Sequence, residues 1–311
     1  MNKKTKKNMN NYWILTLACC LIATACKHET IKPDKPEADT DTEALFSVTD
    51  GQQVIFSKGN LQFCNTGSHA TAEASEATGI FRFAEHQYDY LGQANANISD
   101  TYSGWIDLFC WGSSGWHVSP NSLKDGDYDI ESLCGDEAYA DWGVYNAIGD
   151  GQAGVWRTLT RDEWDYLINQ RKASMVDGTD SARYAEATVA GTAGLVIFPD
   201  NFVRPDAIAP IVNINHNNFA ISFTDNVYTT EQWTLMEQAG AVFLPAAGFR
   251  GGTWLSTIGE GGSYWASTCN ANRQAYALLF IDGLVNSSAE CTYEKDRGYG
   301  RSVRLVKNRI K

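Results

Sequence analysis

Tyr276-Ala277-Leu278-Leu279-Phe280-Ile281 is an apolar run of strand length, one of four strand candidates in the last third of the chain. Glycine-rich and polar segments separate these candidates, as turns separate the strands of a sheet. The last third is therefore predicted to be β structure. The other three candidates are Ala241-Val242-Phe243-Leu244, Tyr264-Trp265-Ala266-Ser267 and Ser302-Val303-Arg304-Leu305-Val306.

The region after residue 45 also has the pattern of short strands. Phe46-Ser47-Val48 and Val54-Ile55-Phe56-Ser57 flank Asp50-Gly51, a pair typical of hairpin turns. Aromatic residues and glycines without a clear period fill residues 102–116, which we expect to form an irregular loop that packs on itself. Further strands are expected at Leu61-Gln62-Phe63, Phe81-Arg82-Phe83, residues 184–189 and residues 194–198.

Two helices have clear start signals. Thr160-Arg161-Asp162-Glu163 and Thr229-Thr230-Glu231-Gln232 both match the capping box, in which the first and fourth residues satisfy each other's backbone N–H groups. Gly240 is the expected stop of the second helix. Two helices among many short strands predict an α+β domain with long irregular loops.

Composition limits the classes of function. The chain has 311 residues, 43% of them hydrophobic and 12% aromatic, which excludes a mostly disordered protein. Its formal net charge is −12 at pH 7. Phosphate binding needs clustered Lys and Arg, so no nucleic-acid partner is expected.

The N-terminus has the pattern of an export signal. Lysines crowd the first seven residues, and residues 12–25 are almost wholly apolar, a length typical of a signal-peptide core. The small residues before Cys26 resemble a lipobox, so residues 1–25 are predicted to be a lipoprotein signal peptide and Cys26 the lipidated residue. The alternatives are an ordinary cleaved signal peptide and a retained membrane helix.

The segment that follows has a different composition. Residues 27–43 carry Lys, Pro, Asp, Glu and Thr with almost no large apolar residue, so we expect residues 26–44 to be a flexible acidic tether. A single domain is expected over residues 45–307. This order predicts an exported protein whose lipid holds it to the cell envelope, with the outer membrane as the expected location. The lipid is its only expected membrane contact.

The predicted domain holds five cysteines, an odd number that leaves at least one outside an intramolecular disulfide. None forms a Cys-x-x-Cys pair, so neither a zinc ribbon nor a thioredoxin-type site is indicated. A disulfide between Cys269 and Cys291 is a hypothesis. The others are Cys64, Cys110 and Cys134.

Three motifs in the last third carry a resemblance to a known family. They are Leu244-Pro245-Ala246-Ala247-Gly248-Phe249-Arg250, Gly262-Ser263-Tyr264-Trp265-Ala266-Ser267 and Gly300-Arg301-Ser302-Val303-Arg304-Leu305-Val306. In this order they resemble the bacterial C-type-lectin-like fold, which formylglycine-generating-enzyme-like proteins and families of exported lipoproteins share. The resemblance implies a small twisted antiparallel sheet, two helices and long loops that display a ligand-binding face. Because the motifs are chiefly packing motifs, they indicate fold better than function.

The resemblance also implies where a ligand would bind. In such relatives the binding residues lie around the strand after the Tyr-Trp-Ala-Ser motif and on the loop before the final strand. The alternative is that these positions are ordinary solvated loop residues. The implied positions are Thr268, Asn270, Asn272, Arg273, Tyr276, Asp282, Asn286, Glu290 and Tyr293.

Catalytic patterns are weak. Formylglycine-generating enzymes use a paired-cysteine copper site, and Cys269 and Cys291 lie outside the matching pattern. The sequence has no His-Glu-x-x-His and no Gly-x-Ser-x-Gly, so neither a zinc hydrolase nor a serine hydrolase is indicated. We expect no enzyme activity and no cofactor.

One acidic segment partly matches a calcium-binding loop. Asp125, Asp127 and Asp129 alternate as in a calcium loop, but Ile130 stands where the loop needs glycine. A solvated acidic loop is the alternative.

These observations predict a non-catalytic cell-envelope lipoprotein that binds a protein or glycan. One alternative is a structural or adhesive component of a surface assembly. An enzyme of the formylglycine-generating type is the third reading.

Overall fold

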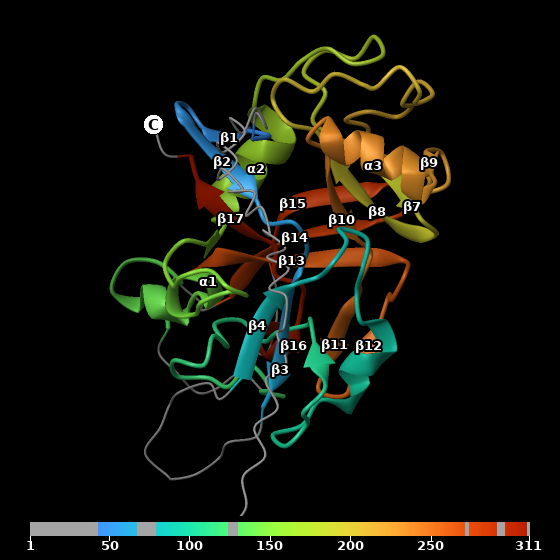
Figure 1. Ribbon diagram of the computed structural model, residues 1–311. Helices are drawn as coiled ribbons and strands as arrows, with labels where there is room; N and C mark the ends of the chain where they lie inside the picture. Colours follow the sequence, from blue (N-terminus) through green and yellow to red (C-terminus); the bar gives the residue numbers. More distant parts are fainter. Residues whose placement is uncertain (1–42, 67–78, 124–129, 271–273, 291–295, 310–311) are drawn as a thin grey trace, which may run out of the picture. The chain divides into compact units, whose positions relative to one another are not determined.

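The computed structural model describes residues 43–66, 79–123, 130–270, 274–290 and 296–309 (Figure 1). Contacts between Cα atoms group Glu43–Lys311 into one compact unit. Cys26, the signal segment, most of the tether and the Asp125–Asp129 loop lie outside the described residues. No helix of the described part is long and apolar enough to cross a membrane.

The architecture is rich in strands. Strands make up 34% and helices 16% of the structure, and the strands of the described part form five small sheets. The expectation of a C-type-lectin-like α+β domain, with one small twisted sheet and two helices, is wrong. Most strands have two to seven residues and pair locally across short turns, so each sheet stays at three or four strands.

Two sheets have four strands each. In the first, the order is β1 (Phe46–Thr49), β2 (Gln52–Phe56), β17 (Leu305–Asn308) and β6 (Arg157–Thr158). In the second, it is β10 (Val242–Pro245), β8 (Thr192–Ile197), β7 (Tyr184–Val189) and β9 (Val227–Tyr228).

Three sheets have three strands each. Their orders are β4 (Gly79–Phe83), β3 (Leu61–Asn65), β5 (Trp105–Ile106); then β12 (Trp254–Ser256), β11 (Phe249–Gly251), β16 (Tyr299–Gly300); and finally β13 (Gly261–Cys269), β14 (Ala275–Ile281), β15 (Leu284–Glu290).

The first sheet joins the two ends of the unit. The predicted hairpin of β1 and β2 is present, with Gly51 at φ +78° in its turn. The last strand, β17, then pairs antiparallel with β2, placing Val306 opposite Phe56. Both side chains are buried in the same core cluster.

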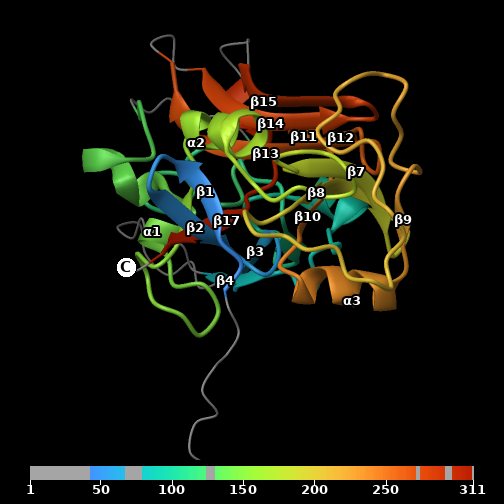
Figure 2. The same cartoon turned by 90° about the horizontal axis from the view of Figure 1, so that it is seen from above.

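Both predicted helix starts are confirmed. α2 (Arg161–Asp165) and α3 (Thr230–Gln238) begin at Thr160 and Thr229, and both capping boxes are complete. Each helix is short, and α2 continues as one π-helical turn, Tyr166–Gln170. In Figures 1 and 2, α3 lies against the β10-β8-β7-β9 sheet and α2 lies beside β1 and β15. The remaining helices are α1 (Trp142–Tyr145) and the 3₁₀ turns Gly92–Asn97, Gly135–Ala140 and Asp296–Gly298.

The prediction that residues 102–116 are irregular is confirmed, but the loop packs against other elements of the unit rather than on itself. Apart from β5, it has little regular structure. Its Trp111 is fully buried and donates a hydrogen bond of 2.8 Å from Nε1 to the carbonyl oxygen of Ala266 in β13. This loop therefore contributes core rather than a displayed tryptophan.

The sheet of β13, β14 and β15 positions the candidate site, because its two faces differ. Side chains alternate across a strand. Tyr264, Leu278, Phe280 and Val285 point into a core cluster. The opposite face presents Ser263 and its partner Leu279, with Ile281 next to them.

Candidate functional site

Among the residues that the structure describes, the loop positions expected from the resemblance do not gather at one place. Strand pairing puts Cys269 opposite Ala275 at one end of the β13–β14 hairpin and Gly261 opposite Ile281 at the other. Thr268, Asn270 and Tyr276 belong to the first end, whereas Asp282 follows Ile281 at the second. Asn286 lies opposite Leu279 in β15. Asn272, Arg273 and Tyr293 lie outside the described residues, as does the side chain of Glu290.

The three positions at the first end have structural contacts. Thr268 Oγ1 accepts a hydrogen bond of 3.3 Å from the backbone N–H of Arg161. The Arg161 guanidinium lies 4.7 Å from the ring centroid of Tyr276, whose side chain is buried in the core. Asn270 Nδ2 donates to Gln274 Oε1 at 2.8 Å, which closes the turn between the strands. These contacts fix α2 and the turn against the sheet.

The two remaining described positions, Asp282 and Asn286, are exposed. Asp282 Oδ1 accepts a hydrogen bond of 2.8 Å from the backbone N–H of Phe223, which ties the β14–β15 turn to the loop that precedes β9. The segment from Leu284 to Glu290, which we expected to be a loop, is strand β15.

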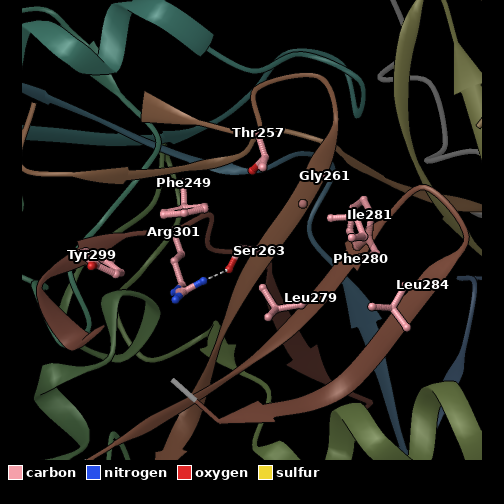
Figure 3. Close-up of a pocket in the computed structure, with 11 residues that line it drawn as sticks. Phe249, Thr257, Gly261, Ser263, Leu279, Phe280, Ile281, Leu284, Tyr299 and Arg301 are labelled. Atoms are coloured by element: carbon pink, nitrogen blue, oxygen red, sulfur yellow. Dashed lines mark hydrogen bonds between the residues drawn. The ribbon is translucent and has the colours of Figure 1, made fainter. Parts of the chain in front are cut away.

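A cavity of about 370 Å³ lies on the outer face of the β13-β14-β15 sheet, near the Asp282 end (Figure 3). We call it the apolar pocket. Leu279, Ile281 and Leu284 line one side, and Phe249 and Tyr299 line the other. Figure 3 shows these two groups on either side of β13, with Arg301 between them.

Small residues in β13 allow the side chains of β14 to pack closely over them at the pocket. Gly261 and Ser263 face Ile281 and Leu279 across the β13–β14 ladder. A Cβ atom on Gly261 would stand 2.6 Å from Cγ2 of Ile281, closer than two carbon atoms can pack. Because Gly261 has no side chain, Ile281 packs directly over its backbone, and both residues line the pocket.

The aromatic wall is formed by a cluster of three rings. Phe249, Trp254 and Tyr299 have ring centroids 5.6 to 5.9 Å apart, the range of favourable aromatic pairs. Gly251 and Gly252, which lie between Phe249 and Trp254 in the chain, allow a tight hairpin, with Gly252 at φ +60°. Trp254 is 53% exposed, whereas most other tryptophans are part of the core.

Arg301 is the one permanently charged side chain in the pocket lining described by the structure, and it is only 6% exposed. Its guanidinium carbon lies 4.9 Å from the ring centroid of Trp265 and 5.6 Å from that of Phe249. Nη1 donates a hydrogen bond to Oγ of Ser263. Within the described residues, Nε is buried without a hydrogen-bond partner and no carboxylate pairs with this guanidinium.

A second cavity, of about 620 Å³, has a different chemistry; we call it the polar pocket. Carboxylates of Glu85, Asp89 and Asp150 line it together with Lys58 and Arg82. Arg82 donates a hydrogen bond of 2.9 Å from Nε to Gln62 Oε1, and its guanidinium lies 3.6 Å from the ring centroid of Trp105. The side chain of Arg82 is thus held in place by residues of β3 and β5.

Metal and cysteine chemistry has little support. Among the residues with described positions, no group of three or more His, Cys, Asp or Glu side chains could hold a metal ion. The calcium hypothesis rests on Asp125–Asp129, outside those residues. Cys291 also lies outside them, so its pairing with Cys269 stays a prediction. Cys134 has an exposed thiol-bearing side chain.

No family model matches the chain, and neither the curated proteins nor the solved structures contain a match. The resemblance drawn from the three motifs therefore has no support beyond the motifs themselves. The sequence analysis did not single out the apolar pocket. A usable signal was Gly261-Gly262-Ser263 within a strand, because glycine in a strand often marks a place where a ligand or another chain segment approaches closely.

Proposed function

We propose that this protein is a non-catalytic ligand-binding protein of the bacterial cell envelope, exported and held to the outer membrane by a lipid on Cys26. The observation that carries the binding function is the apolar pocket. Ligand sites are typically concave, mostly apolar hollows of about 300–1,000 Å³ with a few polar groups. The pocket, at about 370 Å³, has this size and composition.

The pocket chemistry favours binding over catalysis. The described lining of the pocket includes no carboxylate, histidine, cysteine or lysine, the side chains that most often act as general bases or nucleophiles. Ser263 Oγ accepts a hydrogen bond from Arg301 rather than donating to a base such as histidine. A ligand here would be held by contact area and by one cation.

A neutral apolar dye tests this function. We expect N-phenyl-1-naphthylamine to bind the purified full chain saturably, with increased fluorescence. Leu279→Trp should fill the pocket and weaken binding at least about tenfold, since one large side chain excludes the ligand. Val203→Trp is the matched control, because Val203 is 75% exposed and is not one of the residues that line the pocket. No saturable binding to the unaltered chain, or equal binding by both variants, would contradict the proposal.

A second candidate, glycan binding, is favoured by the polar pocket. Tyr90 and Phe83 line it beside Glu85, Asp89 and Asp150, and sugars bind where aromatic faces adjoin hydrogen-bonding groups. A glycan array should give a discrete signal that Tyr90→Ala removes and Tyr139→Ala, a change at an exposed tyrosine, retains. Self-association without any soluble ligand would instead favour the surface-assembly alternative, with the exposed Cys134 as a contact to test.

The anchoring is tested separately. Cys26→Ala should move the protein from the membrane fraction to the soluble fraction, and intact mass should show the loss of the lipid. Membrane association that persists in the Cys26→Ala protein would overturn the lipid anchor while leaving the pocket untouched.

A further inference from the structure

The buried cation in the apolar pocket needs a physical explanation, and it deepens the proposed function, on which this inference rests. Arg301 is 6% exposed and lies between Phe249 and Leu279 (Figure 3). Its guanidinium also contacts the ring of Trp265. A buried charge is unfavourable unless it is paired or fully hydrogen-bonded. For Arg301 the described residues supply a single hydrogen-bond acceptor, the hydroxyl of Ser263.

Two other buried arginines of the same unit have more hydrogen-bond acceptors, although Arg304 Nε, like Arg301 Nε, has no partner among the described residues. Arg171 pairs with Asp200 at 2.8 Å and donates to the carbonyl oxygens of Leu167 and Phe198. Arg304 donates from Nη1 and Nη2 to Asn60, Gln87 and the carbonyl oxygen of Phe243. Each of these guanidinium groups has at least three acceptors. Arg301 differs because it lies at a cavity rather than inside packed core.

We propose that the apolar pocket binds a small organic acid, whose carboxylate accepts hydrogen bonds from Arg301 and whose apolar body lies on Leu279, Ile281 and Leu284. A planar guanidinium matches a carboxylate with two parallel hydrogen bonds, which are charge-assisted. Phe249 and Tyr299 offer aromatic surface to the other side of the ligand. The volume of about 370 Å³ suits an arylalkanoate or a medium-chain fatty acid.

A sugar fits this pocket less well. Thr257, Ser263 and Tyr299 are the uncharged hydroxyl side chains of its described lining, and Ser263 Oγ is already engaged by Arg301. A sugar brings many hydroxyl groups, and each one buried without a partner weakens binding. One cation among apolar walls selects a ligand with one anionic group and an apolar remainder.

Calorimetric titration of the full chain with 3-phenylpropionate and with 3-phenylpropanamide tests the assignment without any substitution. The two probes share their shape and differ in charge. We expect the acid to bind at least about tenfold more tightly than the amide, which corresponds to a charge-assisted hydrogen-bond pair. Equal affinities, or tighter binding of the amide, would overturn the assignment.

Arg301→Met then locates the charge effect. This variant should lose the preference for the acid and still bind N-phenyl-1-naphthylamine, because methionine keeps the pocket apolar. Lys172→Met removes an exposed positive charge elsewhere and should keep the preference. A preference for the acid that survives Arg301→Met would overturn the role of Arg301.

The outcomes separate this inference from the proposed function. If the neutral dye fails to bind the unaltered chain, the binding function itself fails. If the dye binds but acid and amide are equivalent, only the ligand class fails. A peptide ending in a phenylalanine carboxylate that binds about a hundredfold more tightly than 3-phenylpropionate would replace the free acid by a protein C-terminus and overturn the small-molecule assignment.

Discussion

Arg301 Nη1 donates a hydrogen bond to Oγ of Ser263. Arg301 directly follows β16 and Ser263 belongs to β13, and both line the apolar pocket. The contact joins two distant parts of the chain, because β13 and the segment after β16 are about forty residues apart. Backbone pairing supports it, since the N–H of Ser302 donates to the carbonyl oxygen of Ser263 at 2.9 Å. The position of the cation therefore depends on the fold of the last third.

Ser263→Ala should lower the free energy of unfolding by about 1–3 kcal/mol, because it leaves a buried donor of Arg301 without its acceptor. Urea denaturation of the ligand-free protein measures this change. In an Arg301→Met background, the same substitution should cost less than about 0.5 kcal/mol, since residues coupled by a hydrogen bond are not additive. Equal costs in the two backgrounds would mean that the hydrogen bond contributes nothing.

Two buried arginines should respond in opposite ways to the same substitution. Arg301→Met should leave the ligand-free free energy of unfolding within about 1 kcal/mol of the unaltered protein or raise it, because it eliminates a buried charge that has no counter-charge. Arg171→Met should lower it by about 3–5 kcal/mol, because Asp200 would lose its partner at 2.8 Å. Thermal and urea unfolding distinguish the two. A large loss with Arg301→Met would show that this cation is structural.

Local patterns in the sequence predicted local structure well. The Asp50-Gly51 turn, the two capping boxes and the apolar runs at Tyr264 and Tyr276 each became the expected element, since the signal and the structure involve the same few residues. The sheet assignments were not predictable in this way. Val306 pairs with Phe56, and no local pattern states which strands will lie side by side.

The sequence analysis missed the surroundings of polar residues that the fold buries. The resemblance placed Asn286 on a displayed loop before the final strand, whereas the structure places it in β15. In the structure, Ser287 Oγ donates a hydrogen bond to Asp165 at 2.9 Å and receives one from Asn169 at 2.8 Å, so the helix rather than water satisfies it. Arg301 was likewise part of a packing motif in the sequence, and only the three-dimensional arrangement shows that its charge has one described acceptor.

The indole ring of Trp254 packs directly over Gly251, which leaves no space for a side chain there. A Cβ atom at this position would lie 2.3 Å from the indole ring of Trp254, and the three nearest atoms all belong to that ring. Gly251→Ala should therefore lower the free energy of unfolding by about 1–3 kcal/mol through overpacking. Trp254→Ala should relieve most of this cost in the double variant, measured by urea denaturation. An unrelieved cost would place the constraint in the backbone of the hairpin.

Glu186 should make stability depend on pH in a direction opposite to that of an ion-paired carboxylate. Burial raises the pKa of Glu186 from 4.5 to about 7, and the nearby Asp282 and Asp225 raise it further against the hydrogen bond from the Gly283 N–H. Between pH 4.5 and about pH 7, Glu186 therefore keeps its proton in the folded state and has lost it in the unfolded state. The free energy of unfolding therefore falls as pH rises from 4.5 to about 7 and is constant with respect to this group above that.

Glu186→Gln tests this dependence, because glutamine resembles the protonated carboxyl group and keeps an acceptor for Gly283, whose N–H lies 2.9 and 3.1 Å from the two carboxylate oxygens. The variant should match the unaltered protein at pH 4 and be more stable by roughly 2–3 kcal/mol at pH 8. Asp107 and Asp141, whose pKa values burial raises to about 6, add slopes of the same sign, but these cancel in the difference between the two proteins. Urea denaturation at half-unit steps of pH gives that difference, and a difference that stays constant across the series would show that folding does not shift the pKa of Glu186.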